Sequence, residues 1–160
     1  MRIILGLIGA IVATAAPAQG PTPMPIGPII FANSADVQAL VTKAKATIKP
    51  SQPSVIQPLL RLAPYRAVLE YRVAATPANA HINENELVYI LQGSGTIVMG
   101  GTLIGGKTVG NNIIGTSIEG GTARHLMAGD VFIVPHDTPH WFNQIDGTMV
   151  MISMHLPHPA

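Results

Sequence analysis

The feature that most constrains this chain is a pair of short segments in which metal-ligating side chains alternate with turn-forming residues. Histidine, glutamate, glycine and proline recur there at fixed distances, in the patterns His81-x4-Glu86-x6-Gly93 and Gly129-x5-Pro135-x4-His140. Two neutral imidazoles and one carboxylate form a ligand set for a divalent metal, and the incomplete count leaves coordination positions open for water or substrate. A small closed barrel could bring these residues together at one point, although they lie far apart in the sequence.

The spacing of apolar residues favours short strands over most of the chain. Residues 67–73 alternate apolar with polar side chains, as a half-buried strand does. Residues 131–134, 140–145 and 148–156 read as further short strands, and an Asp-Gly turn is expected at residues 146–147. Regular strands of this kind predict an all-β fold, an antiparallel barrel of jelly-roll type over about residues 55–156.

One amphipathic helix is expected before the barrel. Asn33 or Ser34 fits the N-cap position, apolar residues then recur at helical spacing, and Pro50 stops the run. This pattern predicts a helix over residues 34–49 that packs on the outside of the barrel.

Two glycine-containing stretches are assigned to connections. Residues 92–94 separate the strand-like residues 86–91 and 95–99, which predicts a hairpin connection there. Residues 100–121 are rich in Gly, Asn and Thr and predict a loop excursion that contains short strands. The glycines of this excursion do not match a phosphate-binding loop, because no strand-to-helix pattern surrounds them.

The N-terminus has the pattern of a secretory signal peptide over residues 1–18. Arg2 precedes an apolar stretch, and Ala16-Pro17-Ala18 is a small-residue cleavage signature. The apolar stretch is shorter than the about 20 residues needed to span a bilayer, so secretion to a periplasm is expected rather than a stable membrane anchor. Residues 19–33 form a Pro-rich spacer, and residues 34–160 fit a single domain.

Charge and cysteine content exclude several classes of protein. The chain has 9 Lys or Arg against 8 Asp or Glu, and loss of Arg2 with the signal peptide leaves 8 against 8. This neutral balance, with 11% charged residues, argues against a nucleic-acid partner. The absence of cysteine from the sequence excludes disulfides, so the secreted domain must depend on its apolar core.

The two segments resemble the motifs of the cupin superfamily. Residues 79–95 (NAHINENELVYILQGSG) look like the first cupin motif, G-x5-H-x-H-x3-4-E-x6-G, and residues 129–143 (GDVFIVPHDTPHWFN) look like the second, G-x5-P-x-G-x2-H-x3-N. The resemblance implies a small, single-domain, secreted cupin that forms a homodimer. It also implies a metal held by His81, Glu86 and His140, and a scaffold that serves dioxygenases, isomerases, lyases and decarboxylases alike.

The chain departs from these motifs at several positions. Asn79 replaces the first histidine, which makes it a weaker, neutral oxygen donor in the fourth ligand position. Val73 stands at the leading glycine, Asp137 at the turn glycine, and Asn143 lies one residue early. Fe, Mn, Ni and Zn all tolerate mixed imidazole and carboxylate ligands, so the expected cofactor is a divalent metal ion of undetermined identity.

Strand alternation tests whether this ligand set can converge. Glu86, Val88 and Ile90 share one face of an extended strand, and His140 shares a face with Phe142. The three apolar residues among these are expected to form the walls of the site. A carboxylate buried among aliphatic side chains is costly unless a cation pairs with it, which favours a ligand role for Glu86.

The remaining histidines carry weaker expectations. His125 or His155 could complete the ligand set or act as an acid or base beside the metal. His136 is expected to be exposed in a turn, and His158 to lie in a frayed tail. Further side chains that could orient a substrate, or equally lie on the barrel surface or at an interface, are Tyr71, Tyr89, Arg72 and Arg124.

The leading functional hypothesis is a metal-dependent small-molecule enzyme of cupin type, an oxygenase, isomerase or lyase. Two histidines and one carboxylate with open positions are typical of non-haem Fe(II) oxygen chemistry. The alternative is a non-catalytic periplasmic cupin that binds a small molecule, which the Asn79 replacement and the lack of an obvious acid-base residue favour. A purely structural protein would leave the paired motifs unexplained. No residue is assigned a catalytic role from the sequence.

Overall fold

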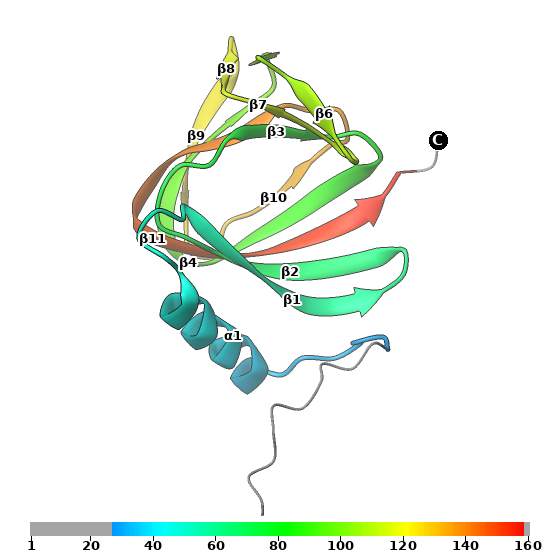
Figure 1. The fold of residues 1–160 in the computed structure, drawn as a ribbon, viewed down its shortest axis with the longest axis vertical. Helices are drawn as coiled ribbons and strands as arrows, with labels where there is room; N and C mark the ends of the chain where they lie inside the picture. The colour runs from blue at the N-terminus through cyan, green and yellow to red at the C-terminus, as the bar shows by residue number, and fades with distance from the viewer. Residues whose placement is uncertain (1–26, 159–160) are drawn as a thin grey trace, which may run out of the picture.

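The structure is a computed structural model that describes residues 27–158. The expected signal peptide and the first part of the expected spacer, up to residue 26, lie outside the described residues. The described chain forms one helix and eleven strands (Figure 1). In chain order they are α1 (Ser34–Thr47), β1 (Ser54–Leu62), β2 (Tyr65–Arg72), β3 (Ala78–His81), β4 (Glu84–Met99), β5 (Thr102–Ile104), β6 (Lys107–Val109), β7 (Asn112–Gly115), β8 (Ser117–Glu119), β9 (Thr122–Met127), β10 (Val131–Val134) and β11 (His140–Pro157).

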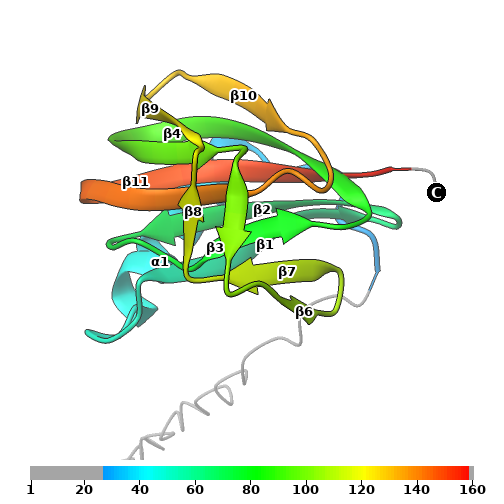
Figure 2. The same ribbon diagram turned by 90° about the horizontal axis from the view of Figure 1, so that it is seen from above.

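All named strand pairs are antiparallel, which confirms the predicted all-β antiparallel fold. The main sheet runs in the order β1-β2-β11-β3-β7-β6, and β4 pairs with β9, β10 and β11. β11 therefore lies at the centre of the fold, because it pairs with β2, β3 and β4 (Figure 2). This strand joins the elements that carry the two sequence motifs.

Two apolar clusters lie on opposite faces of β11. Met149 and Met151 point into the barrel, where they pack with residues of β4 that include Val88 and Ile90. Val150, between them in sequence, points outward into a second cluster beneath α1. The alternation of side chains along one strand therefore fills the barrel interior and also anchors the helix to its outer face.

The helix packs on the outside of the sheet, as expected (Figure 1). Asn33 is its N-cap and forms a capping box with Asp36. The helix ends at Thr47, two residues before the predicted end, because Ile48 is already extended. Lys49 directly precedes Pro50, and a residue in that position disfavours the helical conformation. Within residues 27–158, no helix combines the length and apolar character needed to cross a membrane.

The predicted hairpin at residues 92–94 is wrong. β4 continues through these residues and pairs with β11 along its length, with the register shifting between Ile145 and Met149. Gly93 adopts a positive φ of 78° at this irregularity. The expected turn at residues 146–147 is likewise part of the bulged β11 strand. A glycine within a strand marks a bulge or a close backbone approach, and here it marks both.

The excursion over residues 100–121 contains four short strands. β5 pairs with β8 in a separate small sheet, whereas β6 pairs with β7. β7 in turn pairs with β3, so that Asn112 lies opposite His81. The excursion thus contributes a polar side chain to the motif-bearing part of the barrel.

We predict that Gly93→Ala lowers the free energy of unfolding far more than Gly100→Ala. Both glycines have a positive φ, so each substitution carries the left-handed penalty of about 1–2 kcal/mol. A Cβ at Gly93 would also overlap the backbone carbonyl of Thr148, whereas nothing lies within 4 Å of a Cβ at Gly100. Overpacking adds about 1–3 kcal/mol to the first variant only. Urea unfolding measures the difference, and equal losses in the two variants would contradict the bulge assignment.

Candidate metal centre

The structure brings His81, Glu86 and His140 together from three strands. His81 ends β3, Glu86 lies near the start of β4, and His140 begins β11. All three residues are buried, and one donor atom from each lies within 4.8 Å of the others. Glu86 Oε2 is 3.3 Å from His81 Nε2 and 3.5 Å from His140 Nε2. The residues that the two motifs single out therefore share one point inside the barrel.

Hydrogen bonds to the other ring nitrogens fix the orientation of both imidazoles. His140 Nδ1 lies 3.2 Å from the carbonyl oxygen of Thr138, which can only accept, so this nitrogen carries the hydrogen. His81 Nδ1 lies 2.6 Å from Asn112 Oδ1 and donates in the same way. In the neutral rings both Nε2 atoms therefore carry lone pairs, and both face the Glu86 carboxylate. This arrangement is satisfied either by a proton shared between His81 and Glu86 or by a metal cation that accepts all three electron pairs.

Electrostatics keep Glu86 ionised. Burial is the largest effect and acts to raise its pKa, but the hydrogen bond with His81 and the favourable electrostatic interactions with His140, His81 and His155 together lower the pKa to about 2. Burial lowers the pKa of His140 below its usual value and so favours the neutral ring. Burial is the largest effect on His81 and opposes its charged form, but its hydrogen bonds to Glu86 and Asn112 and the charges of Glu86 and Glu84 together raise the pKa of His81. The site at neutral pH thus contains an anionic oxygen donor beside a neutral imidazole.

Asn79 supplies a further oxygen atom at the same place. It pairs with His140 across β3 and β11 and lines the same cavity. Its side-chain oxygen Oδ1 is buried and has no hydrogen-bond partner among the described residues. Buried polar atoms in proteins are nearly always satisfied, and an orphaned one calls for an explanation such as a bound ion. The donor set of two nitrogens, one carboxylate and one unsatisfied amide oxygen therefore fits a divalent metal.

A cavity of about 370 Å³ opens above these side chains. Phe142 lines it, as predicted. Val88 and Ile90 were expected to be walls but are not among its lining residues, because they lie deeper in the barrel and pack in the core cluster. Alternation identifies the inward face of a strand but not the depth of each residue on that face. The remaining apolar wall comes from Ile56, Val68 and Ile114.

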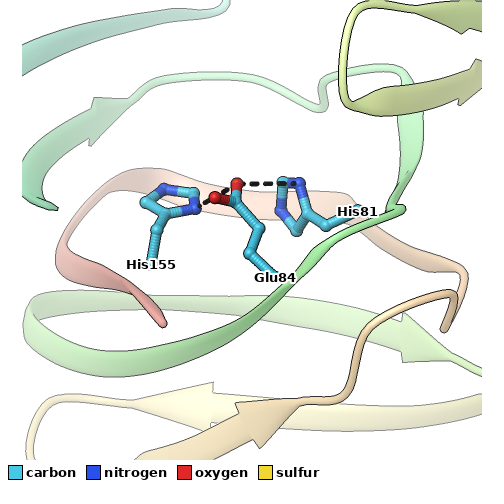
Figure 3. Close-up of side chains that lie close together, drawn as sticks. All are labelled: His81, Glu84 and His155. Carbon is cyan, nitrogen blue, oxygen red and sulfur yellow. Dashed lines mark hydrogen bonds and ion pairs between the residues drawn. The ribbon is translucent and has the colours of Figure 1, made fainter. Parts of the chain in front are cut away.

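A second buried network shares His81 with the first. Glu84 Oε1 lies 2.8 Å from His155 Nδ1 and 3.7 Å from His81 Nδ1, so the carboxylate stands between the two rings (Figure 3). Arg66 donates to both Glu84 oxygens at 2.8 and 2.6 Å. Burial is the largest effect and acts to raise the pKa of Glu84, but the hydrogen bonds and charge of Arg66, together with His155 and His81, lower that pKa. Because Arg66 already compensates this carboxylate, we interpret the cluster as an ion-pair network rather than a second metal site.

The other histidines differ in burial and in whether they line the cavity. His155 points inward, is 7% exposed and lines the cavity. The His125 side chain is 54% exposed and does not line the cavity, so the expectation that it could join the site is wrong. His136 is partly exposed, with its ring stacked on His158 at 3.8 Å between centroids. The backbone of His158 also donates to a carbonyl of the chain, so the expected frayed tail is wrong at this residue.

Of the four candidates for orienting a substrate, only Arg72 lines the cavity. Its guanidinium pairs with Glu70 at 2.6 Å and lies 4.3 Å from the ring centroid of Phe142. The other three candidates lie elsewhere: Tyr71 in the cluster beneath α1, Tyr89 half-buried in β4, and Arg124 exposed in β9.

Sequence reasoning missed three side chains that shape the site. Asn112 lies in the Gly-rich excursion, and no sequence signal connects it with His81. Glu84 could have been predicted to point inward, because it lies two residues before Glu86 on the same strand and so shares its face. Arg66 could have been found only through its pairing with Glu84.

The fold of this chain is similar to the folds of several solved structures. The chain resembles hydroxypropylphosphonic acid epoxidase from S. wedmorenis with a TM-score of 0.52 and 19% identity, over 68% of this chain and 53% of that one. A structure of Fe(II) HppE gives a TM-score of 0.52 and 18% identity, with the same coverage of 68% and 53%. KdgF from Halomonas sp. gives a TM-score of 0.51 and 18% identity, over 70% of this chain and 87% of that one. The match thus spans about half the length of the epoxidase.

Family assignment rests on a match over most of the chain. No curated protein sequence matches it significantly. The profile of the family described as Cupin matches residues 51–159, which include both motifs and every strand. The chain therefore belongs to the cupin family.

Proposed function

We propose that this protein is a metal-dependent small-molecule enzyme in which His81, Glu86 and His140 hold one divalent ion. Asn79 would supply a weaker fourth ligand through its unsatisfied oxygen. The observation that carries the proposal is the convergence of two imidazole nitrogens on one ionised carboxylate in the lining of a cavity. A bound divalent metal would supply Lewis-acid chemistry or a binding position for O2.

The surrounding residues of the chain have separate roles in this proposal. Asn112 and the Thr138 carbonyl hold the two imidazole rings in the orientation that leaves Nε2 free for a ligand bond. The apolar wall that includes Phe142 limits the entry of water and favours a small ligand. Arg72, held by Glu70, presents a positive charge to the same cavity.

The reaction class is proposed as oxygenase, isomerase or lyase. Two histidines and a carboxylate with open positions are the ligand set of non-haem Fe(II) oxygenases. The similar structures include an epoxidase and a form of HppE that holds Fe(II), which supports a divalent metal in this fold. Fe, Mn, Ni and Zn remain the candidate ions, since each accepts mixed nitrogen and oxygen ligands.

We predict that Glu86→Gln lowers metal affinity by more than about 100-fold, because it removes the anionic ligand while keeping the side-chain shape. This exceeds the 10–100-fold typical of losing an outer-shell partner. Asn79→His should raise the affinity, since an imidazole is a stronger donor than an amide oxygen. Titration of metal-free protein with Zn²⁺ measures both effects, and the exposed His125→Gln is the matched control. Wild-type metal stoichiometry in the Glu86→Gln protein would exclude the proposed site.

The same titration tests whether the hydrogen bond to Asn112 holds His81 in position for metal binding. Asn112→Ala should lower Zn²⁺ affinity by about 10–100-fold, because the ring of His81 loses its orienting hydrogen bond. Asn111→Ala is the matched control, since this neighbouring side chain is exposed and makes no such bond. Equal affinities in the two variants would show that Asn112 does not support the metal site.

Catalysis is separated from binding by incubating metal-loaded protein with O2 and a panel of phenolic, keto-acid and sugar compounds. We expect turnover of at least one compound by the wild-type protein and none by the Glu86→Gln protein. Product analysis and oxygen consumption provide the readout. Binding of a compound without turnover would replace the enzyme by the alternative, a non-catalytic periplasmic cupin that binds a small molecule.

We also propose export and homodimerisation. The signature at residues 16–18 supports export, with a mature chain that starts at Gln19. A row of apolar side chains crosses the outer face of three paired strands and supports self-association: Ile133 on β10, Leu87 on β4 and Met154 on β11. These positions carry no charge that would oppose a second copy. Intact mass and light scattering of exported protein test both, and retained residues 1–18 or a monomer would contradict them.

A further inference from the structure

The Arg66–Glu84–His155 network is a built feature of the cavity that the metal proposal does not use. Arg66 and His155 line the cavity, and Glu84 connects them through a buried hydrogen bond with His155 and two part-buried ones from Arg66, at 2.6 to 2.8 Å. Figure 3 shows the Glu84 carboxylate between the rings of His155 and His81. Three polar side chains that are hydrogen-bonded to one another beside a cavity suggest a role in recognising a ligand.

The network sets the tautomer of His155. Its Nδ1 faces a carboxylate oxygen, which only accepts hydrogen bonds, so this nitrogen carries the ring hydrogen. Arg66 already compensates the charge of Glu84, so the carboxylate does not require a positively charged imidazole beside it. The neutral ring then leaves a lone pair on Nε2.

The Nε2 atom of His155 is available to a ligand. Within residues 27–158 this atom has no hydrogen-bond partner, and His155 is one of the residues that line the cavity. In Figure 3 this nitrogen points away from Glu84. His155 also pairs with Glu86 across β11 and β4, and its ring centroid lies 5.3 Å from that of His81. The ring that carries the free acceptor therefore lies close to two residues of the proposed metal site.

We propose that His155 Nε2 accepts a hydrogen bond from a hydroxyl group on the ligand, and that the cavity takes small hydroxylated metal chelators such as 2-hydroxycarboxylates. The inference rests on the proposed metal site and names the ligand class for it. A ligand with only acceptor oxygens would leave the Nε2 lone pair without a partner. Sites built to pair a ligand hydroxyl reject analogues that lack it for this reason. Glu84 and Arg66 act through His155 as positioning residues.

The experiment compares lactate with propionate as probes on Zn²⁺-loaded full-length protein, by calorimetric titration. The two acids differ by one hydroxyl group. Part of any preference for lactate comes from the metal, because the hydroxyl oxygen can also coordinate it. The informative quantity is therefore the change in the lactate preference when His155 is substituted. His155→Phe should weaken lactate binding by about three- to tenfold, the worth of one neutral hydrogen bond, and leave propionate binding unchanged.

Two further variants separate recognition from structural damage. His155→Gln keeps an acceptor oxygen near the Nε2 position and should retain part of the lactate preference. His125→Phe changes an exposed histidine outside the cavity and should have no effect. Zinc content is measured for each sample, so that loss of the metal is distinguished from loss of recognition.

Each outcome decides the question. A parallel loss of lactate and propionate affinity in His155→Phe, or no loss of either, would overturn the recognition role while leaving the metal site intact. Failure of zinc-loaded wild type to bind either probe would also overturn the ligand class. A wild-type protein that takes up no zinc would overturn the proposed function itself, and the inference with it.

Discussion

A negative charge held inside an apolar barrel is the constraint on which the rest of this site depends. Glu86 is buried, and its carboxylate faces two imidazole nitrogens whose lone pairs also point at it. An isolated charge in such a place is costly unless a cation or several hydrogen bonds compensate it. In the metal-free protein a shared proton from His81 can do so, whereas a divalent ion would satisfy all three donors at once. The hydrogen bonds to Asn112 and Thr138 matter because they remove the alternative of turning either ring away.

The fold is arranged to keep these donors in register. β11 joins the two motif-bearing regions, since His140 pairs with β3 and the strand pairs with β4 from His140 to Pro157. The bulge at Gly93 lets these two long strands stay paired while they curve around the core, because no side chain blocks the approach of Thr148. The Gly-rich excursion is also more than a connection, because β7 delivers Asn112 to His81.

Much of this arrangement was predictable from the sequence, for physical reasons that also explain the failures. The period-2 pattern identifies the inward face of β4, and so Glu86 could be placed inside the barrel. It does not report depth, which is why it predicts Val88 and Ile90 as cavity walls although they belong to the core cluster. Gly93 was assigned to a hairpin because a glycine between apolar runs suits a turn and a bulge equally well. The contact of Asn112 with His81 could not be predicted, because it depends on the β3–β7 pairing and no local pattern in residues 100–121 indicates that pairing.

Elemental analysis of the mature protein, purified without added metal, tests the central claim most directly. The convergence of His81, Glu86 and His140 predicts about one divalent ion per chain, since the site has three strong donors and one unsatisfied oxygen. A protein that contains no metal, and that acquires none when Fe²⁺, Mn²⁺, Ni²⁺ or Zn²⁺ is supplied, would contradict it. The buried carboxylate would then have to be compensated by the histidines alone.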